Sequence, residues 1–224
     1  MVVEINKHQK FSENEKRDIA LARAAELKRK IGDYLEKKQM VKTGFEMSDT
    51  INKNKEKLLH YFHATEEDWA NWRWQMSHRI NNVSVLAHLL DLSQEQTDQI
   101  EMVGKKYRWA ISPYYASLIE ASSYQDPILR QSVPSGEELD ETGHDDPMAE
   151  EFTSPAPCIT RRYPDRLIIN VTNQCGMYCR HCQRRRNIGE VDKHQTEANL
   201  RAALDYIRKN REIRDVLITG GDAL

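Results

Sequence analysis

No stretch of the 224-residue sequence approaches the roughly 20 consecutive apolar residues of a membrane-spanning helix. The opening residues, "MVVEINKHQKFSENEKRD", contain no apolar segment typical of a secretion signal. We therefore expect a cytoplasmic protein without a membrane partner. Positive charge is not in excess either, because the formal net charge is −2. A net charge of this size argues against general binding of polyanions, and no nucleic-acid partner is expected.

Cysteine is scarce, with only 4 residues, but its distribution is uneven. Cys175, Cys179 and Cys182 lie in the segment "NQCGMYCRHCQRRRNIGE", among four arginines. Thiols stay reduced in the cytosol, so a cluster of them there indicates metal binding or catalysis rather than disulfides.

Three interpretations of the cysteines compete. Inert buried cysteines are common singly, but not in so tight a pattern beside so many charges. A structural zinc ion needs four ligands, and Cys158 or His181 could complete such a set. An iron–sulfur cluster with four irons would be held by three thiolates, which leaves one iron open to a ligand.

The first half of the chain predicts helices. Residues 12–39 show helical spacing of Ala24, Leu27, Ile31 and Leu35. Further helices are predicted over 48–62, over 64–80 with a stripe of Trp69, Trp72, Met76 and Ile80, and from Ser93 to about Arg108. We expect a helical N-terminal region over 1–121, followed by an irregular connector over 122–160 that holds most of the prolines.

The last part of the chain predicts an α/β fold. Apolar runs over 166–173 and 215–224 are typical of buried strands, and 196–210 is an amphipathic helix with Leu200, Ala203, Leu204 and Ile207 on one face. Strand, helix and strand form a βαβ unit with parallel strands, and ligands of such folds bind beyond the carboxyl ends of the strands. Two parallel strands cannot bury their faces alone, so we expect 161–224 to begin a larger domain.

The C-x3-C-x2-C spacing after a first strand resembles the radical S-adenosylmethionine (SAM) superfamily, in which the open iron of a 4Fe-4S cluster binds SAM. Gly220, Gly221 and Asp222 at the end of the second strand resemble the Gly-Gly-Glu of that superfamily, which contacts SAM, with Asp in place of Glu. Taken alone, the two glycines would indicate only a turn.

The segments "YPDRLIINVTNQCGMYCRHCQRRRNIGE", "IRDVLITGGDAL" and "RWAISPYYASLI" resemble the lysine 2,3-aminomutase family over roughly Trp69 to the end. The resemblance implies a partial (β/α) barrel, of which this chain holds the first βαβ unit. It also implies an isomerase that moves the α-amino group of an amino acid to C3, using a 4Fe-4S cluster, SAM and pyridoxal 5′-phosphate (PLP). The substrate it favours is L-glutamate, with L-lysine as the alternative, because the lysine enzymes tend to carry Thr where Gln183 stands.

The resemblance also assigns residues. Cys175, Cys179 and Cys182 would bind the cluster. Arg162, Tyr163 and Arg166 would contact PLP, and Arg184 would bind the substrate α-carboxylate, while Arg180, Arg185 and Arg186 support the fold. At Cys158 the family tends to carry Gly. If the backbone needs a positive φ at this position, a cysteine there costs stability.

Residues that the family needs lie beyond residue 224 by this resemblance. They include the lysine that anchors PLP, so no catalytic residue is assigned here, and the cysteines of a possible zinc site. We therefore expect the 224 residues alone to be inactive. An electron donor such as flavodoxin or ferredoxin, and a homo-oligomer at full length, are further expectations. An RNA-modifying radical SAM enzyme and a zinc-stabilised interaction module remain the more distant alternatives.

Overall fold

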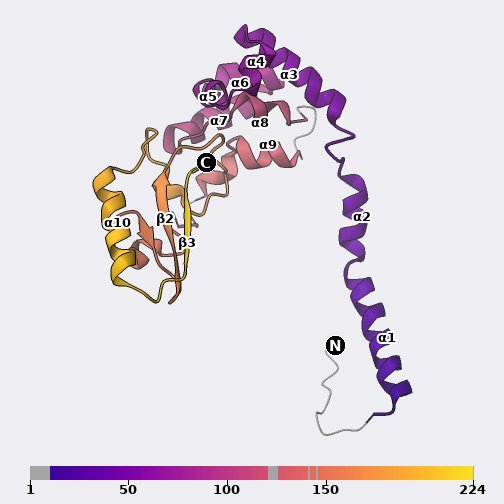
Figure 1. Cartoon of the computed structure of the whole chain (residues 1–224). Helices are drawn as coiled ribbons and strands as arrows, with labels where there is room; N and C mark the ends of the chain where they lie inside the picture. The colour runs from indigo at the N-terminus through magenta and orange to yellow at the C-terminus, as the bar shows by residue number, and fades with distance from the viewer. Residues whose placement is uncertain (1–10, 121–125, 141, 145, 224) are drawn as a thin grey trace. The chain divides into compact units, whose positions relative to one another are not determined.

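The computed structural model describes residues 11–120, 126–140, 142–144 and 146–223. The chain divides into two compact units, residues 1–48 and residues 49–224. We describe the two units separately, with the elements labelled as in Figure 1.

The first unit contains α1 (Glu13–Lys30) and α2 (Gly32–Met40) in place of the single helix predicted over 12–39. Ser12 and Glu15 form the predicted capping box at the start of α1. Helix α1 ends at Lys30 with Ile31 as its C-cap, directly before Gly32, and glycine is among the poorest helix formers. No residue of either helix is buried, so the predicted apolar stripe does not form a core.

In the helical part of the second unit, the two longest helices lie where the sequence predicted them. Helix α3 (Ser48–Phe62) and helix α7 (Gln94–Lys106) have the predicted ranges, and Ser93 and Gln96 form the predicted capping box of α7. The remaining helices of this part are α4 (Glu66–Ala70), α5 (Trp72–Ser77), α6 (Val83–Leu90), α8 (Pro113–Ser117) and α9 (Pro127–Ser132).

The helix predicted over 64–80 is interrupted at Asn71. Its backbone is extended, and its side chain accepts a hydrogen bond from the Arg73 amide, so it ends α4 and begins α5. Trp72 is therefore 63% exposed instead of lying on the predicted inward stripe. Ile80 is buried, but in an isolated bridge with Ile111 rather than in a helix.

One hydrophobic core holds these helices together. Its most deeply buried members come from α3, α6, α7 and the segments on either side of α8, and include Leu58, Leu86, Ile100, Ile111 and Ile119. Helix α6 supplies three buried leucines in eight residues and was not predicted, because it is shorter than the roughly 11–18 residues over which a helical period can be read.

The sheet contains β1 (Ile159–Thr160), β2 (Arg166–Thr172) and β3 (Asp215–Gly220), in the order β1-β2-β3. Strand β2 pairs with β3 in parallel, with Ile168 opposite Leu217, and this confirms the predicted βαβ unit. The two-residue β1 pairs antiparallel to β2 and was not predicted. The described fold is thus mixed α/β, with a helical N-terminal region and a small mixed sheet.

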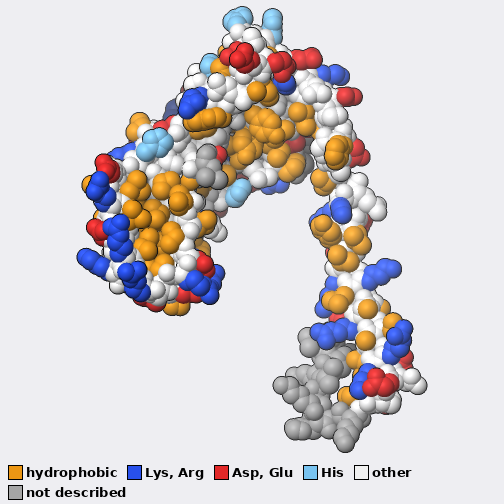
Figure 2. Space-filling view, viewed as in Figure 1, with side chains coloured by type: hydrophobic (Ala, Val, Ile, Leu, Met, Phe, Trp, Pro, Cys, Tyr) orange, Lys and Arg blue, Asp and Glu red, His pale blue; other side chains and the backbone are white. Residues whose placement is uncertain are grey.

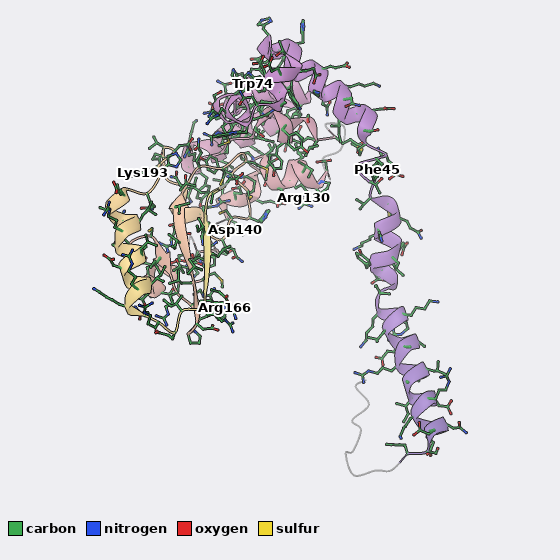
Figure 3. The ribbon with its side chains drawn as sticks, in the orientation of Figure 1. Phe45, Trp74, Arg130, Asp140, Arg166 and Lys193 are labelled. Atoms are coloured by element: carbon green, nitrogen blue, oxygen red, sulfur yellow. The ribbon has the colours of Figure 1, made fainter. Side chains whose placement is uncertain are left out.

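Helix α10 (Glu197–Lys209) lies along the sheet, as predicted from its period (Figure 1). Its fully buried Ala203 packs with Leu167 and Ile169 of β2. Leu204, predicted on the same face, is 48% exposed. Figure 3 shows Arg166 at the end of the sheet where β2 begins, and Lys193 away from it, before α10.

Strand β3 was predicted to be buried, but the described residues leave it exposed. Val216, Leu217 and Ile218 are 42%, 61% and 59% exposed. In the described part of the chain, strand β3 is an edge strand paired only with β2, and none of its side chains belongs to the core that β2 forms with α10. Figure 2 shows hydrophobic side chains gathered on the part of the surface formed by the sheet and α10, bordered by lysine and arginine.

The segment predicted as an irregular connector over 122–160 carries α9, two short 3-10 helices, η1 (Gly136–Leu139) and η2 (Glu150–Thr153), and β1. Residue 121 of the predicted helical region and residues 122–125, 141 and 145 of the predicted connector lie outside the described residues. Within the described residues, no helix combines the length and the apolarity needed to cross a membrane.

Candidate functional site

The structure brings three of the four cysteines together. Cys175, Cys179 and Cys182 follow β2 and line one small cavity of about 40 Å³ together with Gly220 and Gly221. Cys158 lines a different cavity, and its Sγ donates to the carbonyl oxygen of Asn199 at 3.7 Å.

The two residues proposed to complete a zinc set do not join this group. His181 is exposed and does not line the cavity of the three cysteines. Among the residues that the structure describes, no three His, Cys, Asp or Glu side chains are placed to hold one metal ion.

The donors fit an iron–sulfur cluster better than a single ion, because a cluster takes each thiolate on a different iron. Burial and the neighbouring Cys179 raise the pKa of Cys175 to about 11, and burial and Cys182 raise the pKa of Cys179. The raised pKa values favour the neutral thiols of Cys175 and Cys179 at pH 7, so iron would have to displace their protons.

The segment 173–190, which carries the three cysteines, is called the cysteine loop below. A network of charged side chains links it to the helical part of the same unit. Tyr178 is 1% exposed, and its hydroxyl donates to Asp192 Oδ1 at 2.6 Å. Arg108 Nη2 donates to the same oxygen at 2.6 Å, and Arg79 pairs with Asp192 while its Nη1 donates to the Cys175 carbonyl at 2.8 Å. Burial alone would raise the pKa of Asp192, but hydrogen bonds from Tyr178, Arg79 and Arg108 outweigh it and lower the pKa to about 2.

The end of β3 lies against the beginning of the cysteine loop. The Gly221 amide donates to the Thr172 carbonyl at 2.6 Å, and the Asp222 amide donates to the Gln174 carbonyl at 2.7 Å. A Cβ on Gly220 would lie 2.2 Å from the Thr172 oxygen, and one on Gly221 would lie 2.2 Å from the Gln174 oxygen. Both positions therefore need glycine for close backbone approach, whatever ligand they contact.

The predicted anion-binding residues line a second, larger cavity. Its volume is about 480 Å³, and its lining includes Arg162, Tyr163, Arg166, Gln183 and Arg184. The Arg166 guanidinium lies over the Tyr163 ring, 5.4 Å from its centroid.

This cavity runs along the first halves of β2 and β3, not beyond their carboxyl ends, where ligands were expected. Of these two cavities, the cysteine cavity is the one that lies at the carboxyl ends of β2 and β3. The difference arises because Arg162 and Tyr163 precede β2, which places them at the amino end of the sheet. Arg184 lines both cavities.

Each arginine of the cysteine loop pairs with an acid of the connector. Arg180 and Arg185 both pair with Glu138, at 2.6 and 2.8 Å. Arg186 pairs with Asp146 at 3.2 Å, and Arg184 pairs with Glu150 at 2.9 Å. Sequence reasoning missed these acids, although the acid-rich connector was the one signal that could have suggested them.

A βαβ unit with C-x3-C-x2-C after its first strand and two close-packed glycines at the end of its second is typical of the radical SAM class of iron–sulfur enzymes. Comparison with known proteins narrows the class. The chain belongs to the lysine 2,3-aminomutase family. No model of a protein family matches the chain.

Three relatives carry this assignment. The chain is 55% identical to glutamate 2,3-aminomutase of Clostridioides difficile over 212 residues. The aligned region covers 94% of this chain and 50% of that protein. It is 42% identical over 166 residues to L-lysine 2,3-aminomutase of Acetoanaerobium sticklandii (73% of this chain, 40% of that protein). It is also 42% identical over 163 residues to the L-lysine 2,3-aminomutase of Clostridium subterminale (72% and 39%). The chain thus spans half or less of the length of these relatives.

Proposed function

We propose that the protein is a PLP-dependent radical SAM aminomutase that moves the α-amino group of L-glutamate to C3. One observation carries the proposal: Arg184 lies in the wall of both the cysteine cavity and the larger cavity. A substrate held by Arg184 would therefore lie between the site that generates a radical and the site that binds PLP.

The cysteine cavity would hold the cluster and SAM. Cys175, Cys179 and Cys182 supply one thiolate to each of three irons, and the segment from Gly220 to Asp222 contacts SAM. Support comes from the shared cavity and from the backbone hydrogen bonds that hold this segment beside the loop. On this proposal the sheet belongs to a partial (β/α) barrel.

The larger cavity would hold PLP and the amino acid. Arg162 and Arg166 bind the phosphate, since guanidinium groups suit planar and tetrahedral anions, and Tyr163 contacts the cofactor. When bound, the cluster with SAM supplies a radical that removes a hydrogen, and PLP carries the migrating nitrogen. The role of this chain is to bind and orient, and Arg184 fixes the substrate by its α-carboxylate.

The choice of glutamate rests on the similarity to the Clostridioides difficile protein, and Gln183 lies in the same cavity wall as Arg184. L-lysine is the second candidate, because several relatives are named L-lysine 2,3-aminomutase. We further propose a cytoplasmic enzyme, since free thiols suit a reducing compartment, with flavodoxin or ferredoxin as electron donor and a homo-oligomeric state.

Substrate competition tests the proposal. The full-length protein is reconstituted anaerobically with iron, sulfide and PLP, then given SAM, a strong reductant and equal amounts of L-glutamate and L-lysine. We expect β-glutamate as the main product in chromatography with mass detection. Formation of β-lysine alone would show that the substrate is L-lysine. The absence of both products would refute the aminomutase activity.

A further inference from the structure

Glu150 is an almost fully buried acid that grips the arginine proposed to bind substrate. Its side chain is 5% exposed. Its carboxylate accepts hydrogen bonds from Arg184 Nε at 2.9 Å and from Arg184 Nη2 at 3.0 Å. Two parallel bonds of this kind fix both the position and the plane of a guanidinium.

Glu150 is itself held firmly. Its amide donates to Asp146 Oδ1 at 3.0 Å, and the hydroxyls of Thr153 and Ser154 donate to its carbonyl at 3.1 and 2.8 Å. Ala149 before it has a φ of 50°, a left-handed conformation that residues with a Cβ rarely adopt. The connector thus accepts an unfavourable backbone conformation at the residue that leads into Glu150.

The grip uses only one edge of the Arg184 guanidinium. A guanidinium has five N–H donors, and the pair with Glu150 occupies Nε and one N–H of Nη2. No described residue accepts a hydrogen bond from Nη1. The edge formed by Nη1 and Nη2 is therefore available to a second carboxylate, and both Glu150 and Arg184 line the 480 Å³ cavity.

We propose that Glu150 is a positioning residue that holds Arg184 by one edge so that the opposite edge meets the substrate α-carboxylate. This inference rests on the proposed function, because it takes an amino acid as the ligand of Arg184. Glu150 acts on the substrate through Arg184.

Glu150 has two opposite effects on the affinity for the substrate: it positions Arg184, and its negative charge repels the substrate carboxylate. Replacing it with glutamine loses the two-point grip on Arg184, but also removes a negative charge near the incoming carboxylate. These effects have opposite signs on substrate affinity, so the Michaelis constant should change little. Turnover should fall, because small errors in the placement of a reacting group can lower rates about a hundredfold.

The first measurement is independent of activity. Phenylglyoxal modifies accessible arginines, and peptide mass spectrometry gives the rate at Arg184 in the full-length holoenzyme. We expect the rate at Arg184 to rise at least fivefold in Glu150→Gln and to stay unchanged in Glu151→Gln, whose parent side chain is exposed. An unchanged rate at Arg184 in Glu150→Gln would overturn the proposal.

The second measurement is the split between kcat and KM for the amino acid that the wild-type protein converts. We expect Glu150→Gln to lose about tenfold or more in kcat with KM within about threefold, and Glu150→Asp, which keeps both acceptor oxygens, to recover part of the loss. In an Arg184→Lys background, Glu150→Gln should cause no further loss.

The remaining outcomes decide against the proposal in different ways. A higher kcat in Glu150→Gln would mean that Glu150 competes with substrate. Parallel loss of iron, PLP and thermal stability in both Glu150 variants would assign it a structural role. A wild-type protein that converts neither amino acid would refute the proposed function, and the positioning of a carboxylate with it, whereas an active wild type with unchanged Glu150 variants would refute the positioning claim alone.

Discussion

Cys158 has a positive backbone φ of 55°. This is the conformation in which a cysteine costs stability where the family tends to carry glycine. A left-handed residue with a Cβ costs roughly 1–2 kcal/mol relative to a right-handed one. We predict that Cys158→Gly is more stable than Cys158→Ala by about 1 kcal/mol, because both lose Sγ and only Ala keeps the strain. Urea unfolding of the two variants measures the difference, and an equal or greater stability of the Ala variant would contradict it.

Asp192 predicts an acid-dependent loss of stability. Its pKa is about 2 in the folded protein, below the usual 3.8, so its contribution is fully present above about pH 5 and declines as the pH falls toward 2. Asp192→Asn should lower the free energy of unfolding at pH 7 by about 1–3 kcal/mol, because Arg79 and Arg108 lose a charged acceptor.

The measurement is urea unfolding at pH 7, 5 and 3. The gap between wild type and Asp192→Asn should narrow at pH 3, while Asp205→Asn, a change at an exposed pair on α10, should have little effect at any pH. A gap that keeps its size down to pH 3 would mean that Asp192 is not the titrating group.

At the scale of elements, the contact between β3 and the cysteine loop depends on Gly221. The Cβ of an alanine would lie 2.2 Å from the Gln174 oxygen and 2.8 Å from the Asn173 carbonyl carbon. We predict that Gly221→Ala destabilises the protein by about 1–3 kcal/mol, as overpacking does. Gly143→Ala is the matched control, since nothing lies within 4 Å of its Cβ position. Equal melting temperatures for the two variants would refute the close approach.

The sequence predicted elements with local signals and missed those without them. Helices α3, α7 and α10 and strand β2 have caps or clear periods, and they appeared with nearly the predicted bounds. Helix α6 has only eight residues and β1 has only two, so neither is long enough for a period to be read. The break at Asn71 and the exposure of β3 depend on a cap geometry and on strand order, which a pattern of apolar residues does not contain.

The site divides in the same way. The three cysteines were predictable because their spacing is local, and the structure places them in one cavity. Their supports were not predictable, because Arg79 lies 113 residues before Asp192 and Glu150 lies 34 before Arg184. Such pairs are set by tertiary packing.

The cysteine loop as an element predicts which thiols matter for iron. We predict that Ser variants of Cys175, Cys179 and Cys182 lose most of the iron and sulfide bound after anaerobic reconstitution, because serine removes the soft donor. Cys158→Ser should retain wild-type iron, since Cys158 lines another cavity. Iron loss confined to Cys158→Ser would overturn the assignment.

At the scale of the whole molecule, the second unit has two cavities that share one arginine, Arg184, in their walls. The helical part and the connector supply the carboxylates that hold the cysteine loop, and the βαβ unit supplies the walls of both cavities. We therefore propose that one amino acid, held at Arg184, undergoes both hydrogen removal and migration of its own amino group.

The fate of the migrating nitrogen tests that claim most directly. The full-length holoenzyme is incubated anaerobically with SAM, reductant and L-glutamate labelled with ¹⁵N at the α-amino group, in a medium containing unlabelled ammonium. The account predicts β-glutamate that carries the full ¹⁵N label on C3, detected by NMR. Unlabelled β-glutamate would show an elimination and re-addition of ammonia, and the absence of any β-amino acid would contradict the aminomutase assignment itself.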